Sequence, residues 1–371
     1  GSALSRTAIV KSGAHRYFVW TTHHSVYDGW SFAKTMELLT GLLRGQPLSV
    51  SVPVSRFIAY LSRQDKDQTA AFWQKHLQGA NWTRYPALPS PQQPVNPRDT
   101  LRSHLQVPLA MSSVTTSTVL RAAWALLVAA HTGVNEAVVN VVLSGRMAPV
   151  EGITDLIAPT ITTVPFRVST SPDQSVCEFL AEVHDRATEM IPYEHSGLRN
   201  IRRMVPGLGS DFDPGHIFVV QPAGEAESGT PMLDMKVEHA PSSMDAFDAY
   251  ALTVECTVEQ MTREVSVELR YDNAVIPDDN ARRLLSQFRY IVQKLAQDTE
   301  ASKPLGQLSL LSAEDDEQFR RWNSTMPPRV ERCVHDLVLD KMATQPTAPA
   351  ISAWDGEMTY GQLENASRQL A

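Results

Sequence analysis

The chain has 371 residues, 43% of them hydrophobic and 20% charged, with a formal net charge of −8 at pH 7. This composition can bury sizeable cores, which excludes a chain disordered throughout, and the length suits two lobes. Because binding to nucleic-acid phosphates calls for a basic surface, the negative charge argues against a nucleic-acid partner. The longest apolar run, residues 122–130, is much shorter than the roughly 20 residues of a membrane span, so we expect no membrane segment.

The three cysteines are odd in number and widely spaced, at Cys177, Cys256 and Cys333. This usage is typical of reduced thiols rather than of a disulfide framework. With no signal-peptide pattern at the start, it predicts a cytoplasmic location.

In chain order, the first predicted element is a strand. Aromatic and β-branched residues alternate through Arg16–Thr22, as in a strand buried on both faces. Residues 32–43 then carry apolar side chains at helical spacing. Two histidines, His23 and His24, therefore lie where the strand ends and the chain turns towards a helix, a common place for chemistry.

Adjacent residues on an extended backbone point to opposite faces, so the two histidines cannot readily approach one ligand together. His24 is nearer the turn and is our candidate for a cleft, where an imidazole can accept a proton near neutral pH. Asp28 is placed to fix the loop through backbone amides or a distant arginine, and Gly29 to permit a backbone conformation that other residues resist. From the residues alone, a structural histidine pair stays open as the alternative. A metal site is disfavoured because no Cys or His cluster completes a ligand set.

The remaining elements alternate between helices and strands. A proline-rich stretch at 86–97 predicts a linker. Pro165 predicts an edge strand or the end of a strand, and the apolar run at 137–143 predicts an inner strand. The predicted helices are 55–78, 113–131, 177–190 and 279–295, and the predicted strands are 105–109, 137–143, 160–168, 212–221 and a hairpin of 250–258 with 264–271.

A resemblance adds what spacing cannot. The run His23-His24-Ser25-Val26-Tyr27-Asp28-Gly29 resembles the His-His-x-x-x-Asp-Gly signature of condensation domains in nonribosomal peptide synthetases, especially fungal ones, which belong to the chloramphenicol acetyltransferase-like superfamily. Other motifs of that family follow in order: Phe57-Ile58-Ala59-Tyr60 with Phe72-Trp73, Ser144-Gly145-Arg146, Pro159 to Arg167, and Ile191-Pro192-Tyr193-Glu194-His195. The resemblance covers nearly the whole chain.

The resemblance implies an α/β fold, the chloramphenicol acetyltransferase-like two-lobed sandwich, with a partial N-lobe and a complete C-lobe. Residues 1–97 would be the remnant of the N-lobe with the catalytic loop and the lobe linker, because two arginine-containing motifs that precede the histidines in the family are absent. Residues 98–302 would be the C-lobe. Residues 303–371, with an acidic run at 314–317 and Pro327-Pro328, would form a linker and the start of an adenylation domain.

The resemblance also assigns residues. His24 would be catalytic, and His23, Asp28, Gly29 and Arg167 would support it, with Arg167 pairing with Asp28 to lock the loop. The candidates for the substrate tunnel are Trp30, Ser31, Ser144 and Arg146. No bound cofactor and no metal are implied, because the substrates arrive on the 4'-phosphopantetheine arms of carrier proteins.

The implied reaction is amide-bond formation between an acyl or peptidyl thioester on an upstream carrier and the amine of an aminoacyl group on a downstream carrier. The implied partners are therefore the two peptidyl carrier domains and a downstream adenylation domain. Epimerisation and terminal cyclisation domains of the same fold, a small-molecule acyltransferase that uses coenzyme A, and a catalytically silent carrier-docking module stay open as alternatives.

Overall fold

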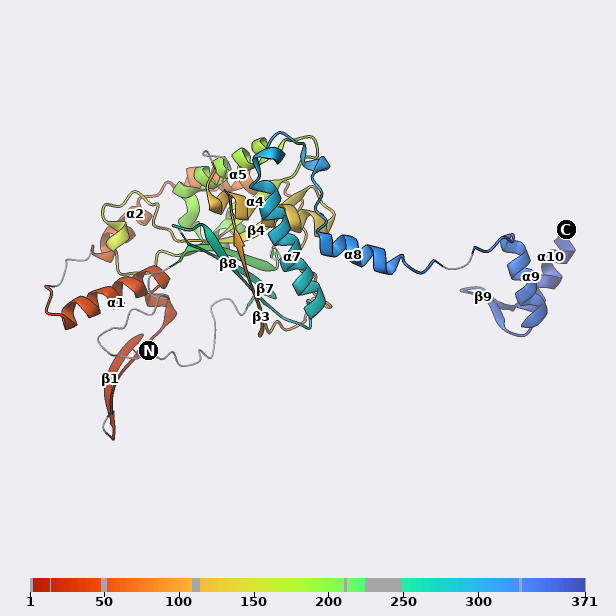
Figure 1. The fold of residues 1–371 in the computed structure, drawn as a ribbon, viewed down its shortest axis with the longest axis horizontal. Helices are drawn as coiled ribbons and strands as arrows, with labels where there is room; N and C mark the ends of the chain where they lie inside the picture. Colours follow the sequence, from red (N-terminus) through yellow and green to blue (C-terminus); the bar gives the residue numbers. More distant parts are fainter. Residues whose placement is uncertain are drawn as a thin grey trace. The chain divides into compact units, whose positions relative to one another are not determined.

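The computed structural model describes residues 3–13, 15–47, 52–108, 114–209, 212–223, 249–259, 261–326 and 329–370. The chain divides into two compact units, residues 1–315 and 316–371 (Figure 1). The first unit carries the long sheet and all the residues predicted for the site.

The first unit is built on a six-stranded mixed sheet in the order β3-β8-β7-β6-β4-β5. Its strands are β3 (Asp99–Gln106), β4 (Glu136–Leu143), β5 (Thr162–Ser169), β6 (His216–Pro222), β7 (Leu252–Val258) and β8 (Glu264–Tyr271). The pairs β4·β6 and β6·β7 are parallel, and the other neighbours are antiparallel. The predicted β7–β8 hairpin, the inner position of β4 and the edge position of the proline-containing β5 are confirmed. The strand expected at 105–109 begins earlier, at Asp99.

The helices of this unit are α1 (Gly29–Leu43), α2 (Val54–Ser62), α3 (Lys66–Leu77), α4 (Thr116–Thr132), α5 (Val176–Met190), α6 (Leu198–Met204) and α7 (Asp278–Leu295). Short 3-10 turns lie at η1 (His24–Val26), η2 (Ile153–Asp155), η3 (Ile191–Ser196), η5 (Asp298–Glu300) and η6 (Leu305–Gln307). The four helical regions predicted between residues 55 and 295 are all helical, and the first, predicted to hold more than one helix, contains α2 and α3.

Helix α4 is the centre of the main core. Its N-cap is Thr115, whose side chain accepts a hydrogen bond from the backbone N–H of Thr118, and its C-cap is Gly133 in the left-handed conformation. The ring of Trp124 stacks on Phe218 of β6 and meets Phe288 of α7 edge-on. Helix α4 is apolar all round because it is enclosed by the sheet and by α5 and α7 (Figure 1).

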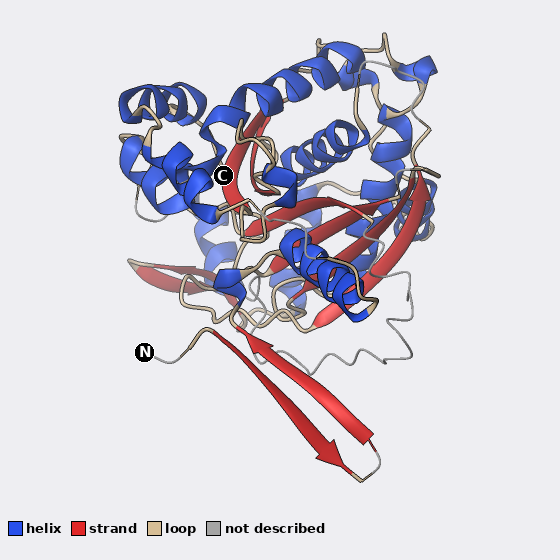
Figure 2. Cartoon of the chain, turned by 90° about the vertical axis from the view of Figure 1, so that its left-hand side faces the viewer, coloured by secondary structure: helices blue, strands red, loops and turns tan. Residues whose placement is uncertain are grey.

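Strands β1 (Ser5–Ser12) and β2 (His15–Thr22) form a separate antiparallel hairpin. Figure 2 shows the hairpin projecting from the rest of its unit. The strand prediction is confirmed, but burial on both faces is wrong. Ile9 is 74% exposed, and Tyr17 and Phe18, which lie on opposite faces, are 49% and 50% exposed.

The second unit contains α9 (Val334–Thr344), β9 (Pro349–Ala353), β10 (Gly356–Thr359) and α10 (Tyr360–Leu370). The acidic run expected in a linker is instead helical, within α8 (Ala313–Trp322), which spans the boundary between the units. Ion pairs one turn apart favour this helix, since Asp316 pairs with Arg320 and Glu317 with Arg321. The Pro327-Pro328 part of the predicted linker lies outside the described residues.

Within the described ranges, no helix is long and apolar enough to cross a membrane. Cys177, Cys256 and Cys333 are all free thiols.

His76 of α3 covers the outer edge of β5. Its Nε2 accepts the backbone N–H of Arg167 at 3.3 Å, so the ring must be neutral at that nitrogen. Burial lowers the pKa of His76 to about 4, and the nearby charges of Arg186 and Arg167 add to the effect.

We expect this histidine to contribute to acid sensitivity. Because the folded-state pKa lies below the ordinary value of about 6.5, the unfolded chain binds more protons between these values, and stability is lost as the pH falls from 6.5 towards 4, by at most about 3 kcal/mol. His76→Gln should flatten the dependence of the melting temperature on pH over this window. His104→Gln, at an exposed histidine of β3, is the matched control and should leave the slope unchanged; equal slopes in all three proteins would contradict the assignment.

Candidate active site

The histidine loop, residues 23–28, joins β2 to α1. It is fixed at its start by the backbone N–H of His23, which donates to the carbonyl oxygen of Leu4 at 2.7 Å. At its end Asp28 is the N-cap of α1: its carboxylate accepts the Ser31 N–H at 2.8 Å, and the Ser31 hydroxyl accepts the Asp28 N–H at 2.8 Å. This reciprocal capping box explains locally why the helix begins at Gly29.

The two histidines hold their protons on different nitrogens. The Ser25 N–H donates to Nδ1 of His23 at 3.1 Å, so this nitrogen is unprotonated. Nδ1 of His24 lies 3.1 Å from the carbonyl oxygen of Tyr27, which can only accept, and so it carries the proton. The His24 ring stacks on Tyr27 at a centroid distance of 4.5 Å, and the bond at Nδ1 leaves Nε2 as the nitrogen that can act as a base.

Asp28 is the anchor of the histidine loop and is only 4% exposed. Beside the Ser31 N–H, its carboxylate accepts the Thr160 N–H at 2.8 Å and lies 3.0 and 3.2 Å from Nη2 of Arg146. Burial alone would raise the pKa of Asp28, but the hydrogen bonds from Thr160 and Ser31 and the charge of Arg146 outweigh it and lower the pKa below its ordinary value. The group is therefore an anchored carboxylate, as predicted from its position.

The partner of Asp28 is Arg146, from the arginine turn, residues 144–146, that follows β4. Its guanidinium is buried and also donates to three carbonyl oxygens, those of Ile153, Leu156 and Ala158, at 2.8 to 3.1 Å. On one side it lies 5.6 Å from the centre of the Trp30 ring. Burial lowers the pKa of Arg146, and the charge of Asp28 opposes the shift.

The predicted pairing of Asp28 with Arg167 is wrong. The Arg167 guanidinium instead bonds to Glu136 at 2.7 Å and to the carbonyl oxygen of Gln78 at 3.2 Å, which fastens the end of α3 to the sheet. The strand register supplies the reason. Thr162 pairs with Leu143 next to the arginine turn, whereas Arg167 pairs with Val138, five residues and therefore about 17 Å further along the strand.

The conformational role predicted for Gly29 is also wrong. Gly29 is the first residue of α1, has no positive φ, and a Cβ added there would meet open space. The glycine that the site requires is Gly145 in the arginine turn. Its φ is +69°, and an added Cβ would lie 1.9 Å from the carbonyl oxygen of Thr160. The Ser-Gly-Arg run after a strongly β-prone segment is the sequence signal for this turn.

The four tunnel candidates divide into two pairs. Ser31 and Arg146 are buried and brace Asp28, so they do not line a tunnel, whereas Trp30 and Ser144 are exposed. The indole N–H of Trp30 donates to the carbonyl oxygen of Thr154 at 2.8 Å. The backbone carbonyl oxygen of Ser144 accepts a hydrogen bond from the Thr160 hydroxyl at 2.6 Å. His23 and His24 are exposed as well.

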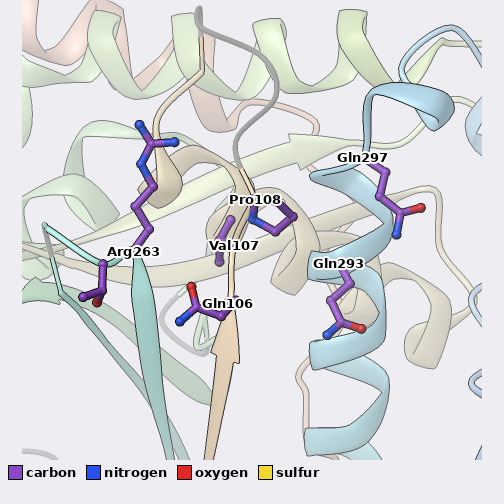
Figure 3. A pocket seen from close by; sticks show the side chains of 7 residues that line it. Gln106, Val107, Pro108, Arg263, Gln293 and Gln297 are labelled. Carbon is purple, nitrogen blue, oxygen red and sulfur yellow. The ribbon is translucent and has the colours of Figure 1, made fainter.

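Two pockets of about 600 and 540 Å³ lie elsewhere in the described part of this unit. The larger, between the ends of β3 and α7, is lined by Gln106, Val107, Pro108, Thr262, Arg263, Gln293 and Gln297 (Figure 3). The smaller lies between residues 83–87, the end of α4 and the start of α7. None of the predicted site residues lines either pocket.

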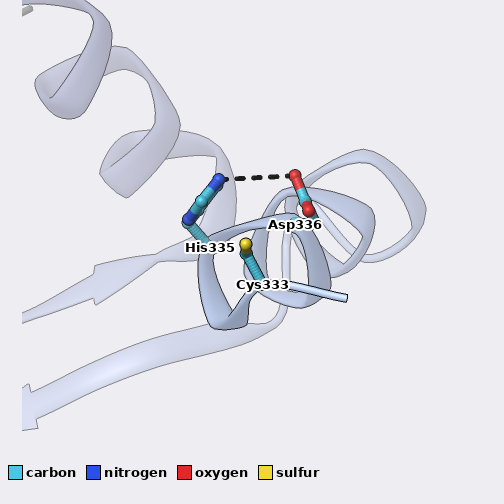
Figure 4. Close-up of side chains that lie close together, drawn as sticks. All are labelled: Cys333, His335 and Asp336. Atoms are coloured by element: carbon cyan, nitrogen blue, oxygen red, sulfur yellow. Dashed lines mark ion pairs between the residues drawn. The ribbon is translucent and has the colours of Figure 1, made fainter. Parts of the chain in front are cut away.

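One group of metal-ligand atoms occurs among the described residues, at the start of α9 in the second unit. It comprises Cys333, His335 and Asp336, whose ligand atoms lie within 4.8 Å of one another (Figure 4). All three come from one turn of chain, and Cys333 and His335 are exposed. Metal ligands are usually held by further hydrogen bonds in a shielded setting, so we assign no metal to this group.

The Asp28–Arg146 pair gives a quantitative prediction. Arg146→Met leaves a buried carboxylate without its charged partner and should cost about 3 to 5 kcal/mol of unfolding free energy. Adding Asp28→Asn removes that charge, so the double variant should be more stable than the sum of the single costs implies, by about 1 to 3 kcal/mol.

Arg167→Met is the matched control, because it also removes the arginine of an ion pair, one that is somewhat more exposed than Asp28–Arg146. Its cost should add to that of Asp28→Asn within about 0.5 kcal/mol. Urea unfolding of the parent, the three single variants and the two double variants measures these free energies. If the costs of Arg146→Met and Asp28→Asn simply add, while those of Arg167→Met and Asp28→Asn do not, Asp28 pairs with Arg167 as expected from the motif.

Comparison with known proteins identifies the family of the chain. The profile of the condensation domain family matches residues 1–319. A nonribosomal peptide synthetase 32 of Fusarium pseudograminearum is 61% identical over 374 residues, and the synthetase vlms of a Lecanicillium species is 59% identical over 373. Both matches cover all of this chain but only 4% of the relative's length.

Solved structures show the same fold at low sequence identity. The starter condensation domain of rhizomide synthetase RzmA superposes with a TM-score of 0.58 at 16% identity, covering 83% of this chain and 72% of that one. A four-domain nonribosomal peptide synthetase bound to AMP and glycine gives 0.63 at 14% identity, covering 99% of this chain and 30% of that one. With its histidine loop anchored through Asp28 and a family match across most of its length, the chain belongs to the condensation domain family of nonribosomal peptide synthetases.

Proposed function

We propose that this domain forms an amide bond between two carrier-bound substrates. An acyl or peptidyl thioester on the phosphopantetheine arm of an upstream peptidyl carrier is attacked by the amine of an aminoacyl group on a downstream carrier. The new C–N bond replaces the C–S bond, the upstream arm leaves as a thiol, and the product stays on the downstream carrier.

The single observation that carries this proposal is the hydrogen bond from His24 Nδ1 to the Tyr27 carbonyl oxygen. It leaves Nε2 as the nitrogen that accepts the amine proton during attack, or that stabilises the developing oxyanion once protonated. His23 cannot play the same part from the same side, because its Nδ1 is bound by Ser25 within the loop.

The other site residues act through position. Asp28 joins the histidine loop to the arginine turn and to Thr160, and so it limits how far His24 can move. Much of the rate enhancement is expected from holding the two thioester arms in reactive geometry, for which effective molarities are on the order of 10⁵ M or more. A loop fixed at both ends suits that task. Trp30 and Ser144, both exposed, are the tunnel candidates that remain.

The carrier and adenylation partners also belong to this proposal. The family match ends at residue 319, close to the boundary between the two units. The four-domain synthetase covers 99% of the chain, whereas the starter condensation domain alone covers 83%. These observations support an assignment of the second unit to the start of an adenylation domain. The exposed apolar side chains of the β1–β2 hairpin support the assignment of residues 1–97 to part of an N-lobe, in which other residues of the lobe would bury these side chains. Residues 98–302 are then the C-lobe.

Three alternatives are separated by product analysis. An epimerisation domain would change the configuration of one carrier-bound residue without joining two, and a terminal cyclisation domain would release product from the carrier. A silent docking module would give no product. The adenylation-like unit after residue 315 favours elongation, and it also disfavours a coenzyme A-dependent acyltransferase.

The test is His24→Ala in the intact synthetase module with both carriers loaded. Loss of the basic nitrogen should lower the rate of transfer to the downstream carrier by at least about 100-fold, measured by intact-protein mass spectrometry. The melting temperature should not change, since His24 is exposed.

His104→Ala removes another exposed histidine, on β3, and should transfer at the parent rate. Undiminished transfer by His24→Ala would refute the role of His24. No transfer by the parent module would refute amide formation itself.

A further inference from the structure

The arginine turn is held from a side that the histidine loop does not touch. A Cβ built on Gly145 would lie 1.9 Å from the Thr160 carbonyl oxygen and 2.5 Å from Cε1 of His195. The turn is therefore packed directly between the start of the β5 segment and η3. A side chain at position 145 would therefore push the turn away from one or both of these neighbours.

The contact with η3 is a directed hydrogen bond. Nε2 of His195 lies 3.1 Å from the carbonyl oxygen of Gly145. Since a carbonyl oxygen can only accept, Nε2 must carry the proton, and His195 is the donor. The ring meets Phe57 of α2 edge-on at 5.0 Å. Burial lowers the pKa of His195, although the bond to Gly145 opposes the shift, which favours the neutral ring.

A second acceptor near His195 is farther away. Oε1 of Glu194 lies 3.6 Å from Nε2, beyond hydrogen-bond distance, and has no hydrogen-bond partner among the described residues. Burial raises the pKa of Glu194 to about 7, against the opposing charge of Arg121. The backbone carbonyl of Glu194 accepts the Thr162 hydroxyl at 2.8 Å. Residue 194 thus fixes η3 to β5, while the side chain of residue 195 is directed at the turn.

From Gly145 a continuous set of bonds leads to the histidine loop. The next residue, Arg146, binds the Asp28 carboxylate at 3.0 Å. The residue before, Ser144, accepts the Thr160 hydroxyl at 2.6 Å, and the Thr160 N–H donates to the same carboxylate. His195 therefore lies two hydrogen-bonded steps from Asp28, on a different element from every residue in the histidine signature.

We propose, resting on the amide-forming role proposed above, that His195 is a positioning residue for the histidine loop. Its Nε2–H bond to Gly145 holds the arginine turn where Arg146 and Thr160 grip Asp28, and so it sets the orientation of His24. It touches no reacting atom. The rival role is that of an ordinary packed side chain, which would affect stability alone.

The experiment separates these roles with variants at one position in the intact module. His195→Leu keeps bulk and removes the donor. His195→Gln keeps a donor that can reach the Gly145 carbonyl, and His195→Asn keeps a donor that is too short. His184→Leu is the matched control, since His184 is another half-buried histidine with a single side-chain bond, to Thr118 of α4.

The first readout is amide hydrogen exchange at Ser31 and Thr160, the two N–H groups that donate to Asp28. Exchange should quicken by about tenfold in His195→Leu and His195→Asn, the factor that one net hydrogen bond is worth. It should return to the parent rate in His195→Gln and stay there in His184→Leu. The second readout is single-turnover transfer, which should fall by about the same factor with carrier affinity unchanged.

Parent exchange and parent transfer in His195→Leu would overturn the proposal. The proposal would also be overturned if exchange and transfer in His195→Gln were as strongly altered as in His195→Asn. This second comparison does not need the Leu variant, so it decides the question even if His195→Leu fails to fold. The two proposals can fail separately. If the parent module makes no amide while exchange follows the pattern above, the positioning role stands and the amide-forming function falls.

Discussion

The structure of the site depends on one buried carboxylate. Asp28 is almost fully removed from solvent, and such a charge is tolerated only if it is paired and hydrogen-bonded. Two of its partners come from segments more than a hundred residues away, Arg146 and Thr160, and the third, Ser31, lies in the first turn of the helix that Asp28 caps. The need to satisfy this group joins a short exposed loop to the main sheet of the unit.

This arrangement separates rigidity from chemistry. His24 is exposed, and among the described residues its ring is hydrogen-bonded to and stacked on Tyr27 alone, within the loop. Its position is therefore set by the ends of the loop, at Leu4 and at Asp28. The Asp28 network therefore places an accessible imidazole ring on a preorganised support.

The edge strand β5 makes two separate sets of contacts. Near its start Thr160 and Thr162 bind the carboxylate of Asp28 and the backbone of η3. Further along, Arg167 fastens α3 to the sheet, and His76 accepts the exposed backbone N–H of the edge. Both arginines of the neighbouring motifs pair with a carboxylate, but only one of those carboxylates belongs to the histidine loop.

Local patterns in the sequence determined most of the secondary structure, including the edge position of the proline-containing strand, and the histidine motif with its ordered companions identified the family. The alternation in β2 could not show whether its faces are covered, because periodicity reports amphipathicity and not the neighbours that bury a face. Only the tertiary structure shows that Asp28 pairs with Arg146 and not with Arg167. The pairing depends on strand register, because five residues along a strand correspond to about 17 Å. The same holds for Gly145 and His195, whose roles exist only where distant segments touch.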